Sequence, residues 1–312
     1  MLSVIIPAYN EEAMVAKAAA VIDGILADAE IGYELIFVDD GSKDRTWEII
    51  AETASGNTIV RGLHFSRNFG KEAAIMAGLA SAGGDCCAVI DCDLQHPPEK
   101  LVEMYRLWQQ GYQIVEGQKS SRGTEGKLHT WAAKSFYALI SAATGFDMAN
   151  ASDFKLLDRK AVDVLVNMKE KNAFFRALSS WVGFKTTYVT FDVQEREAGE
   201  SKWSTRSLIK YAVSNISAFS TAPMQIVTVL GVIMFVVSLV LGGIALVQKL
   251  CGQALEGFTT VILIQLFSSS VVMVSLGIIG YYIAKIYEEI KDRPRYIIAE
   301  TCGKGVHETT NR

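Results

Sequence analysis

The sequence is poor in cysteine and carries no excess of positive charge. Its five cysteines form no C-x-x-C pair and leave an odd one over, which argues against a disulfide framework and favours a reduced setting for the N-terminal part. The formal net charge of −4 argues against a broad nucleic-acid-binding surface. The first residues lack a basic stretch and their apolar run ends at Pro7, a pattern that predicts a strand rather than a signal peptide.

Two common phosphate-binding motifs are also missing. No G-x-G-x-x-G follows the first apolar run, and no G-x-x-x-x-G-K-[ST] occurs anywhere in the chain. Dinucleotide-binding and P-loop functions therefore lose support.

What the sequence does contain is an alternation of short apolar runs with segments of helical spacing. The runs cover residues 2–6, 34–38, 59–65 and 86–90, and the helical segments about 10–29, 45–54, 71–82 and 99–110. Strands alternating with helices of this length predict a parallel, doubly wound α/β sheet. We expect Asn10 to cap the first helix and Asp158 to cap a later one.

Polar and acidic side chains stand where these predicted strands end. Tyr9 follows the first strand, Asp39 and Asp40 follow the second, and Asp91 and Asp93 follow the fourth. Ligands of doubly wound sheets bind at the carboxyl ends of the strands. Residues i and i+2 of an extended chain share a face, so Asp91 and Asp93 are expected to converge on one cation. Mg²⁺ or Mn²⁺ carrying a diphosphate fits such a site; for an isolated D-x-D, a solvated loop is the alternative.

Four motifs in fixed order resemble those of a known family. They are Pro7-Ala8-Tyr9-Asn10-Glu11-Glu12, Val38-Asp39-Asp40-Gly41-Ser42 with Asp44-Arg45-Thr46, Arg67-Asn68-Phe69-Gly70-Lys71-Glu72, and Asp91-Cys92-Asp93-Leu94-Gln95. Together they resemble the family-2 glycosyltransferases of GT-A fold, in particular polyprenyl-phosphate glycosyltransferases, which include dolichol-phosphate mannose synthases. The greatest similarity is to bacterial undecaprenyl-phosphate (bactoprenol) glucosyltransferases. The resemblance spans almost the whole chain and implies a Rossmann-like α/β catalytic domain.

The resemblance implies a nucleotide-sugar pocket with a divalent metal. Asp39 or Asp40 would hold the base or ribose, and Asp93 with Gln95 would ligate Mg²⁺ or Mn²⁺. His96 departs from the acidic residue common at this position, and is either a further ligand or an exposed loop residue. The implied donor-binding residues are Pro7, Tyr9, Glu11, Val38, Asp39, Asp40, Asp91, Cys92, Lys119, Arg196 and Lys202.

Basic loops and one further carboxylate complete the implied site. Arg122 and Lys127, together with Lys119, are candidates for contacts with the acceptor phosphate, and Arg67 and Lys71 are further phosphate candidates. Arg196 and Lys202 belong to a loop that would close over the donor diphosphate.

Asp153 occupies the family position of the proposed catalytic acid/base. A lipid monophosphate has a second pKa of about 6 and is largely deprotonated at neutral pH. The attacking oxygen therefore hardly needs a base. Orienting the acceptor, taking a residual proton and holding the sugar all remain open as roles for this carboxylate.

The last third of the chain has the composition of a membrane anchor. Residues 204–221 form an amphipathic segment suited to an anionic membrane surface. Arg206 and Lys210 lie on one face of it, and Lys202 precedes them at the same spacing of four. Residues 223–247 and 258–284 are uncharged and long enough to span a bilayer. Flanking lysines and arginines place the catalytic domain and both termini in the cytoplasm.

The expected division of the chain is therefore a GT-A domain at 1–203, an interface helix at 204–221, a membrane hairpin at 222–285 and a cytoplasmic tail at 286–312. We expect the tail to lie along the lipid headgroups or along the domain. Gly231, Gly242, Gly277 and Gly280 would let helices pack closely, within a protomer or in a homo-oligomer.

The function expected is inverting transfer of a hexose, glucose from UDP-glucose, to undecaprenyl phosphate at the bacterial cytoplasmic membrane. Mannose, an N-acetylhexosamine or an aminoarabinose derivative stay open as the sugar. A processive polysaccharide synthase is disfavoured because Q-x-x-R-W is absent. A non-catalytic membrane scaffold or lipid flippase is the alternative from a different class.

Overall fold

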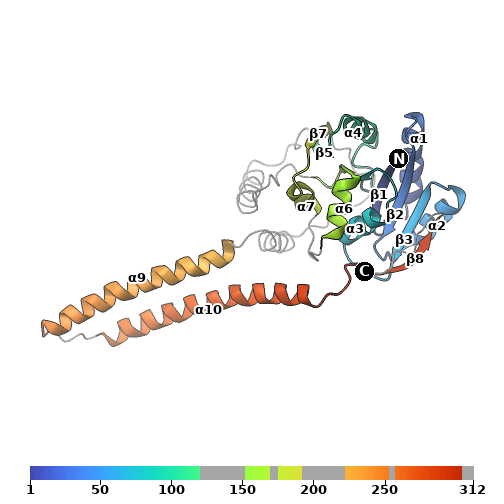
Figure 1. The fold of residues 1–312 in the computed structure, drawn as a ribbon. Helices are drawn as coiled ribbons and strands as arrows, with labels where there is room; N and C mark the ends of the chain where they lie inside the picture. The colour runs from blue at the N-terminus through green and yellow to red at the C-terminus, as the bar shows by residue number, and fades with distance from the viewer. Residues whose placement is uncertain (120–151, 169–174, 192–221, 253–256, 304–312) are drawn as a thin grey trace, which may run out of the picture. The chain divides into compact units, whose positions relative to one another are not determined.

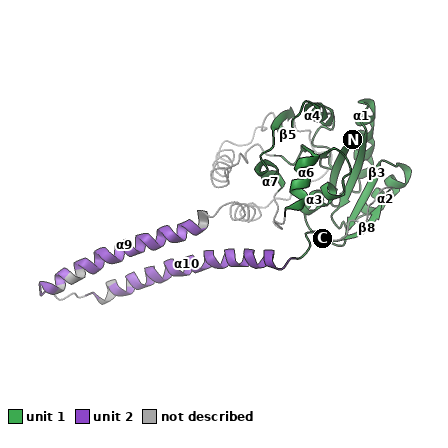
Figure 2. Cartoon of the chain, viewed as in Figure 1, with its two compact units in different colours: residues 1–203, 293–312 green, residues 204–292 purple. Residues whose placement is uncertain are grey.

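The computed structural model describes the chain except for residues 120–151, 169–174, 192–221, 253–256 and 304–312 (Figure 1). The chain divides into two compact units (Figure 2). One unit contains residues 1–203 together with 293–312, and the other contains residues 204–292.

The centre of the first unit is a parallel sheet with helices in between. β1 (Leu2–Ala8) pairs with both β2 (Tyr33–Asp39) and β4 (Cys86–Val89), and β2 pairs with β3 (Val60–Phe65). All seven residues of β1 are buried, as expected for a strand covered on both faces. The intervening helices are α1 (Val15–Asp28), α2 (Thr46–Gly56) and α3 (Lys71–Ser81), followed by α4 (Lys100–Gln109). This part of the fold was predicted correctly.

The rest of the sheet is mixed rather than parallel, which corrects the expectation of a wholly parallel sheet. The strand order is β7-β5-β6-β4-β1-β2-β3-β8. β6 (Lys155–Asp158) runs antiparallel to β4 and to β5 (Ile114–Lys119), while β7 (Thr186–Phe191) is parallel to β5. Apolar alternation shows that a segment is a strand but not its direction, which depends on where the chain re-enters the sheet.

Two helix caps were predicted, and one of them is wrong. Asp158 caps α6 (Arg159–Asn167) and accepts a hydrogen bond from the Lys160 amide at 3.0 Å. Asn10 does not cap α1, which begins after Met14. Asn10 has φ of 55° and its Oδ1 accepts from the Lys43 amide at 2.9 Å. Its amide side chain therefore joins the loops that follow β1 and β2.

The chain after the second long helix returns to the sheet. β8 (Ile298–Cys302) pairs antiparallel with β3 and forms the edge of the sheet. Of the two places expected for the tail, this segment takes the one along the domain.

The second unit contains two long apolar helices, α9 (Ala222–Leu250) and α10 (Phe258–Ile290). By length and composition, Met224–Ile244 and Ile264–Ile290 could each cross a membrane, with mean hydropathies of 2.6 and 1.8. The predicted pair of apolar helices is thus present. The expected interface helix at 204–221 lies outside the described residues.

A buried ion pair links the antiparallel part of the sheet to α7 (Phe175–Trp181). The Lys155 ammonium group, fully buried, donates to the Glu116 carboxylate and to Ser179 Oγ at 2.7 Å. Burial lowers the pKa of Lys155, and the charge of Glu116 opposes that shift. Lysine is almost never fully buried without a partner, and Glu116 is the counter-charge of this buried ammonium group.

Replacing Glu116 by alanine should destabilise the protein strongly, because it leaves the buried Lys155 without its counter-charge. The expected loss is about 3–5 kcal/mol, or a fall of about 6–20 °C in the melting temperature. Thermal unfolding of the purified protein measures it.

The matched control is Glu103→Ala. Glu103 pairs with Lys100 at 2.7 Å, but its side chain is 51% exposed, so the expected cost is below about 1 kcal/mol. Equal shifts for the two variants would contradict the role of the buried pair.

Candidate active site

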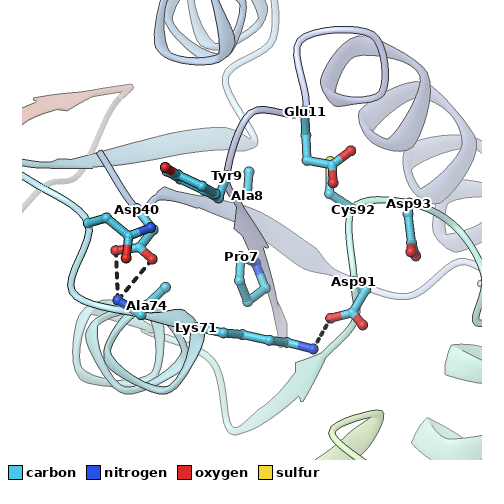
Figure 3. A pocket seen from close by; sticks show the side chains of 12 residues that line it. Pro7, Ala8, Tyr9, Glu11, Asp40, Lys71, Ala74, Asp91, Cys92 and Asp93 are labelled. Atoms are coloured by element: carbon cyan, nitrogen blue, oxygen red, sulfur yellow. Dashed lines mark hydrogen bonds and ion pairs between the residues drawn. The ribbon is translucent and has the colours of Figure 1, made fainter. Parts of the chain in front are cut away.

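A cavity of about 410 Å³ opens where β1, β2 and β4 end (Figure 3). This volume is within the range of ligand pockets, about 300–1,000 Å³. The lining residues come from the ends of these strands and from the first turns of α3: Pro7, Ala8, Tyr9, Glu11, Asp40, Asn68, Gly70, Lys71, Ala74, Asp91, Cys92 and Asp93. Each of the four motifs that sequence analysis singled out therefore contributes at least one residue to this cavity.

Asp39 faces away from this cavity. It is fully buried, and its Oδ1 accepts from the Ser42 amide at 3.1 Å and from the Ser42 hydroxyl. The other oxygen, Oδ2, lies 2.6 Å from His64 Nδ1. Both oxygens are thus used to shape the turn after β2.

Asp40, the neighbouring carboxylate, lines the cavity. Its Oδ1 accepts from the Phe69 amide at 2.6 Å. Its Oδ2 accepts from the Gly70 amide at 2.9 Å (Figure 3). Burial raises the pKa of Asp40, although these two amides act in the opposite direction. Of the two carboxylates that sequence analysis left open, Asp40 is the one within reach of a ligand.

The turn after β4 brings two further carboxylates to the cavity. β4 ends at Val89, and Leu94 has φ of 56°. Asp91 and Asp93 therefore lie in a turn. The prediction that they share one face of an extended strand was wrong. Asp93 Oδ1 accepts from the Gln95 amide at 3.1 Å. Both carboxylates nevertheless line the pocket.

Lys71, at the start of α3, bridges two acidic residues. Its ammonium nitrogen lies 2.6 Å from Asp91 Oδ1 and 2.9 Å from Asp153 Oδ2. Burial lowers the pKa of Lys71, but the two carboxylates outweigh it and the net pKa is raised. Sequence analysis proposed a phosphate contact for this lysine; here its partners are carboxylates.

Asp153 is held by two cations. Besides Lys71, Arg176 on α7 donates from Nε to Oδ1 at 2.7 Å and from Nη2 to Oδ2 at 2.8 Å, the bidentate geometry that arginine favours with a carboxylate. Burial acts to raise the pKa of Asp153, but Arg176 and Lys71 hold it well below its usual range. So weak a proton acceptor is better suited to fixing cations than to acting as a general base.

Glu72 ends one of the four motifs, but sequence analysis gave it no role of its own. It accepts from the Phe175 amide at 2.8 Å. Burial, together with the negative charge of Asp153, raises its pKa to about 7. The first turns of α3 and α7 therefore meet at a proton-binding group beside the ion cluster.

The pocket suits a divalent metal that takes most of its ligands from elsewhere. Among the residues that the structure describes, no group of three or more His, Cys, Asp or Glu side chains is arranged to hold a metal. Mg²⁺ commonly uses one or two carboxylates and completes its shell with water and substrate phosphates. Carboxylate oxygens such as those of Asp93 fit this use. Burial raises the pKa of Cys92, so this residue offers no thiolate.

His96 packs against aromatic rings next to the pocket. It stacks on Phe154 with ring centroids 5.1 Å apart, and meets Phe191 edge to face at 5.3 Å. Its Nδ1 lies 3.9 Å from Asp91 Oδ2. The ring is thus largely buried, not exposed in a loop.

The other predicted site residues lie elsewhere. Val38 is fully buried in β2 and is not among the residues that line the cavity. Gln95 approaches the pocket through its backbone amide, and Lys119 is the last residue of β5. Four basic residues fall outside the described part of the chain: Arg122, Lys127, Arg196 and Lys202.

The carboxylate-lined edge of this mixed sheet is the GT-A arrangement, and comparison with known proteins supports it. The family model described as "Glycosyl transferase family 2" matches residues 3–166. The chain belongs to glycosyltransferase family 2 and is a glycosyltransferase.

Similar proteins match this chain over nearly its whole length. A glycosyltransferase of Bacillus subtilis, YkcC, is 39% identical, with 96% of this chain and 94% of the relative covered. A glycosyltransferase of Synechocystis is 36% identical, with 97% and 96% covered. The bactoprenol glucosyl transferase of Shigella phage SfV is 35% identical, with 95% and 97% covered.

The solved structures found are more distant. Glucosyl-3-phosphoglycerate synthase of Mycobacterium tuberculosis, in complex with Mn²⁺, UDP-glucose and phosphoglyceric acid, is 23% identical with a TM-score of 0.48. The alignment covers 70% of this chain and 78% of that one.

The raised pKa of Glu72 predicts a specific pH dependence of stability. Between 4.5 and about 7 the folded protein holds a proton that the unfolded chain has released, so stability falls as the pH rises through this window. Glu72→Gln keeps an acceptor for the Phe175 amide and removes this loss. Relative to wild type, the variant should gain on the order of 2 kcal/mol, about 4–8 °C in melting temperature, between pH 5 and pH 8.

Glu48→Gln is the matched control, because Glu48 is also in the first turn of its helix but is exposed. It should show no such pH-dependent gain. If Glu72→Gln differed from wild type by the same amount at pH 5 and pH 8, the assignment of this titration to Glu72 would be wrong.

Proposed function

We propose that this glycosyltransferase moves glucose from UDP-glucose to undecaprenyl phosphate at the cytoplasmic face of a bacterial membrane. The observation that carries the proposal is the match to bactoprenol glucosyl transferases at 34–35% identity over at least 95% of this chain. That match extends beyond the catalytic domain through the two apolar helices. Transfer to a lipid, rather than to a soluble acceptor, accounts for these helices.

The donor would occupy the carboxylate-lined pocket. Pro7, Tyr9 and Glu11 would border the nucleotide, and Asp40 would accept hydrogen bonds from its base or ribose. Asp93, with Gln95 beside it, would hold Mg²⁺ or Mn²⁺ against the diphosphate, and this ion would neutralise charge on the leaving group. Arg196 and Lys202 would add positive charge at the same position.

The acceptor chemistry needs positioning more than base catalysis. One oxygen of the lipid phosphate attacks the anomeric carbon while the bond from that carbon to the diphosphate breaks, which releases UDP and inverts the anomeric configuration. At neutral pH the attacking oxygen is largely deprotonated already. The low pKa of Asp153 agrees with a role in which it fixes Lys71 and Arg176. Lys119, Arg122 and Lys127 would attract the acceptor phosphate.

The two apolar helices would anchor this site at headgroup height. If both cross the membrane, the catalytic unit and the C-terminal segment lie on the same side. The basic residues on either side of the hairpin, which include Lys210 and Arg293, favour the cytoplasmic side for both.

A transfer assay tests the proposal. Purified protein is incubated with Mg²⁺ or Mn²⁺, undecaprenyl phosphate and a panel of labelled UDP- and GDP-sugars. We expect a glucosyl-lipid from UDP-glucose that is lost when EDTA is added. Asp93→Asn should lower the rate by about 100-fold or more, because it removes a carboxylate charge from the site where diphosphate charge develops.

Asp163→Asn is the control, since Asp163 is 61% exposed on α6 and forms only a 3.8 Å ion pair with Arg159. This variant should retain the wild-type rate. If only a different donor gave product, its sugar would replace glucose in the proposed reaction. No product from any donor would contradict lipid-linked transfer as proposed.

A further inference from the structure

The segment that follows the membrane hairpin is bound closely to the catalytic unit. We call residues 295–302 the C-terminal strap. Its strand β8 pairs with β3, and beyond the irregularity between His64 and Phe65 the Ser66 amide donates to the Ile297 carbonyl at 3.0 Å. Arg295 also donates to the Met168 carbonyl. The contacts of the strap therefore continue past the end of β3 into the loop at residues 66–70.

Aromatic contacts connect the strap to the pocket. The Tyr296 ring stacks on Phe65, with centroids 5.2 Å apart and planes 9° apart. Phe65 is fully buried and meets Phe69 edge to face at 5.8 Å. The Phe69 amide in turn donates to Asp40 at 2.6 Å. Three rings in contact thus join Tyr296 to a carboxylate that lines the cavity.

A second set of contacts reaches the other carboxylate at the end of β2. Glu300 accepts from Trp47 Nε1 at 2.9 Å. The Trp47 ring stacks on His64 at 5.0 Å, and His64 Nδ1 lies 2.6 Å from Asp39 Oδ2. Asp39 also accepts from the Ser42 amide. The contacts from Glu300 through Trp47 and His64 therefore reach the turn after β2, which contains Asp40.

The two loops that the strap supports also touch each other tightly. Gly41 has φ of 64°, and a Cβ atom placed on it would lie 2.4 Å from the Arg67 carbonyl carbon. The two backbones are therefore packed against each other, with no room for a side chain at Gly41. A shift of residues 66–70 would break or strain the hydrogen bonds from the Phe69 and Gly70 amides to Asp40.

We propose that the C-terminal strap is a positioning element of the donor site: Tyr296 and Glu300 fix the two loops that hold Asp40. This inference rests on the proposed function of the pocket as a nucleotide-binding site. It also implies an order of events, because the strap follows both apolar helices in the chain. A chain still being synthesised acquires the complete donor site only after the membrane hairpin has been made.

The simpler alternative is that β8 only covers an exposed sheet edge, which native proteins commonly do. Edge covering predicts that strap substitutions lower stability without a specific effect on residues 66–70. The positioning role predicts faster local opening at the Phe69 and Gly70 amides, the two donors to Asp40.

Hydrogen exchange of the full-length protein separates these alternatives without any ligand. In Tyr296→Ala, we expect the Phe69 and Gly70 amides to exchange about tenfold faster or more, since local opening controls exchange of such amides. Tyr296→Phe keeps the ring and should restore the wild-type rate. Thr301→Ala, on the exposed strand β8 itself, is the control for a general loosening of the edge and should leave these amides unchanged.

Binding of UDP in the presence of Mn²⁺ gives a second readout. Tyr296→Ala should weaken it by about fivefold to tenfold if the bound conformation of the loop is populated less. If Tyr296→Ala fails to fold, Glu300→Ala replaces it, because Glu300 is exposed. In that variant the Ser42 amide should exchange faster than in wild type. Glu300→Gln should restore the wild-type exchange rate of this amide.

The proposal would be overturned if Tyr296→Ala folds and its Phe69 and Gly70 amides exchange at the wild-type rate, even if its melting temperature falls. An unchanged rate at Ser42 in Glu300→Ala would overturn it equally. Failure of the wild-type protein to bind UDP would instead contradict the proposed function. The exchange result would still decide whether the strap positions the loop.

Discussion

The candidate site depends on one ammonium group placed between two carboxylates. Asp91, after β4, and Asp153, before β6, both reach the Lys71 ammonium nitrogen, and two carboxylates so close together cost free energy without a cation. Lys71 lies within 2.9 Å of both, and Arg176 completes the charge balance around Asp153. The first turns of α3 and α7 thus supply the positive charge that these two carboxylates need.

The same cluster explains how the chemistry is divided among the carboxylates. Asp153 is so strongly paired with cations that it stays ionised, whereas burial leaves Glu72 with a pKa of about 7. Asp40 and Asp93 stand apart from the cluster and line the cavity. A fixed ion network on one side of the pocket and further carboxylates on its lining suit a transferase that positions two charged substrates.

Sequence reasoning predicted the parts of this site that local patterns encode. Tyr9, Asp40, Asp91 and Asp93 follow buried parallel strands, so their arrival at one edge could be predicted. Adjacent residues such as Asp39 and Asp40 point to opposite sides, and nothing in the sequence tells which side is the pocket. Arg176 and the strap could not be foreseen, since their partners are distant in the chain and β8 is a short strand whose pairing leaves no local signal. The direction of β6 was missed for the same reason.

We propose that the pocket binds a nucleotide diphosphate together with a metal ion that Asp93 ligates. The most direct measurement is a crystal structure of the protein with UDP and Mn²⁺, in which anomalous scattering at the manganese absorption edge locates the ion. The account predicts one anomalous peak within coordination distance of an Asp93 carboxylate oxygen and of the UDP diphosphate. Manganese bound away from Asp93, or UDP bound outside the cavity at the ends of β1, β2 and β4, would contradict it.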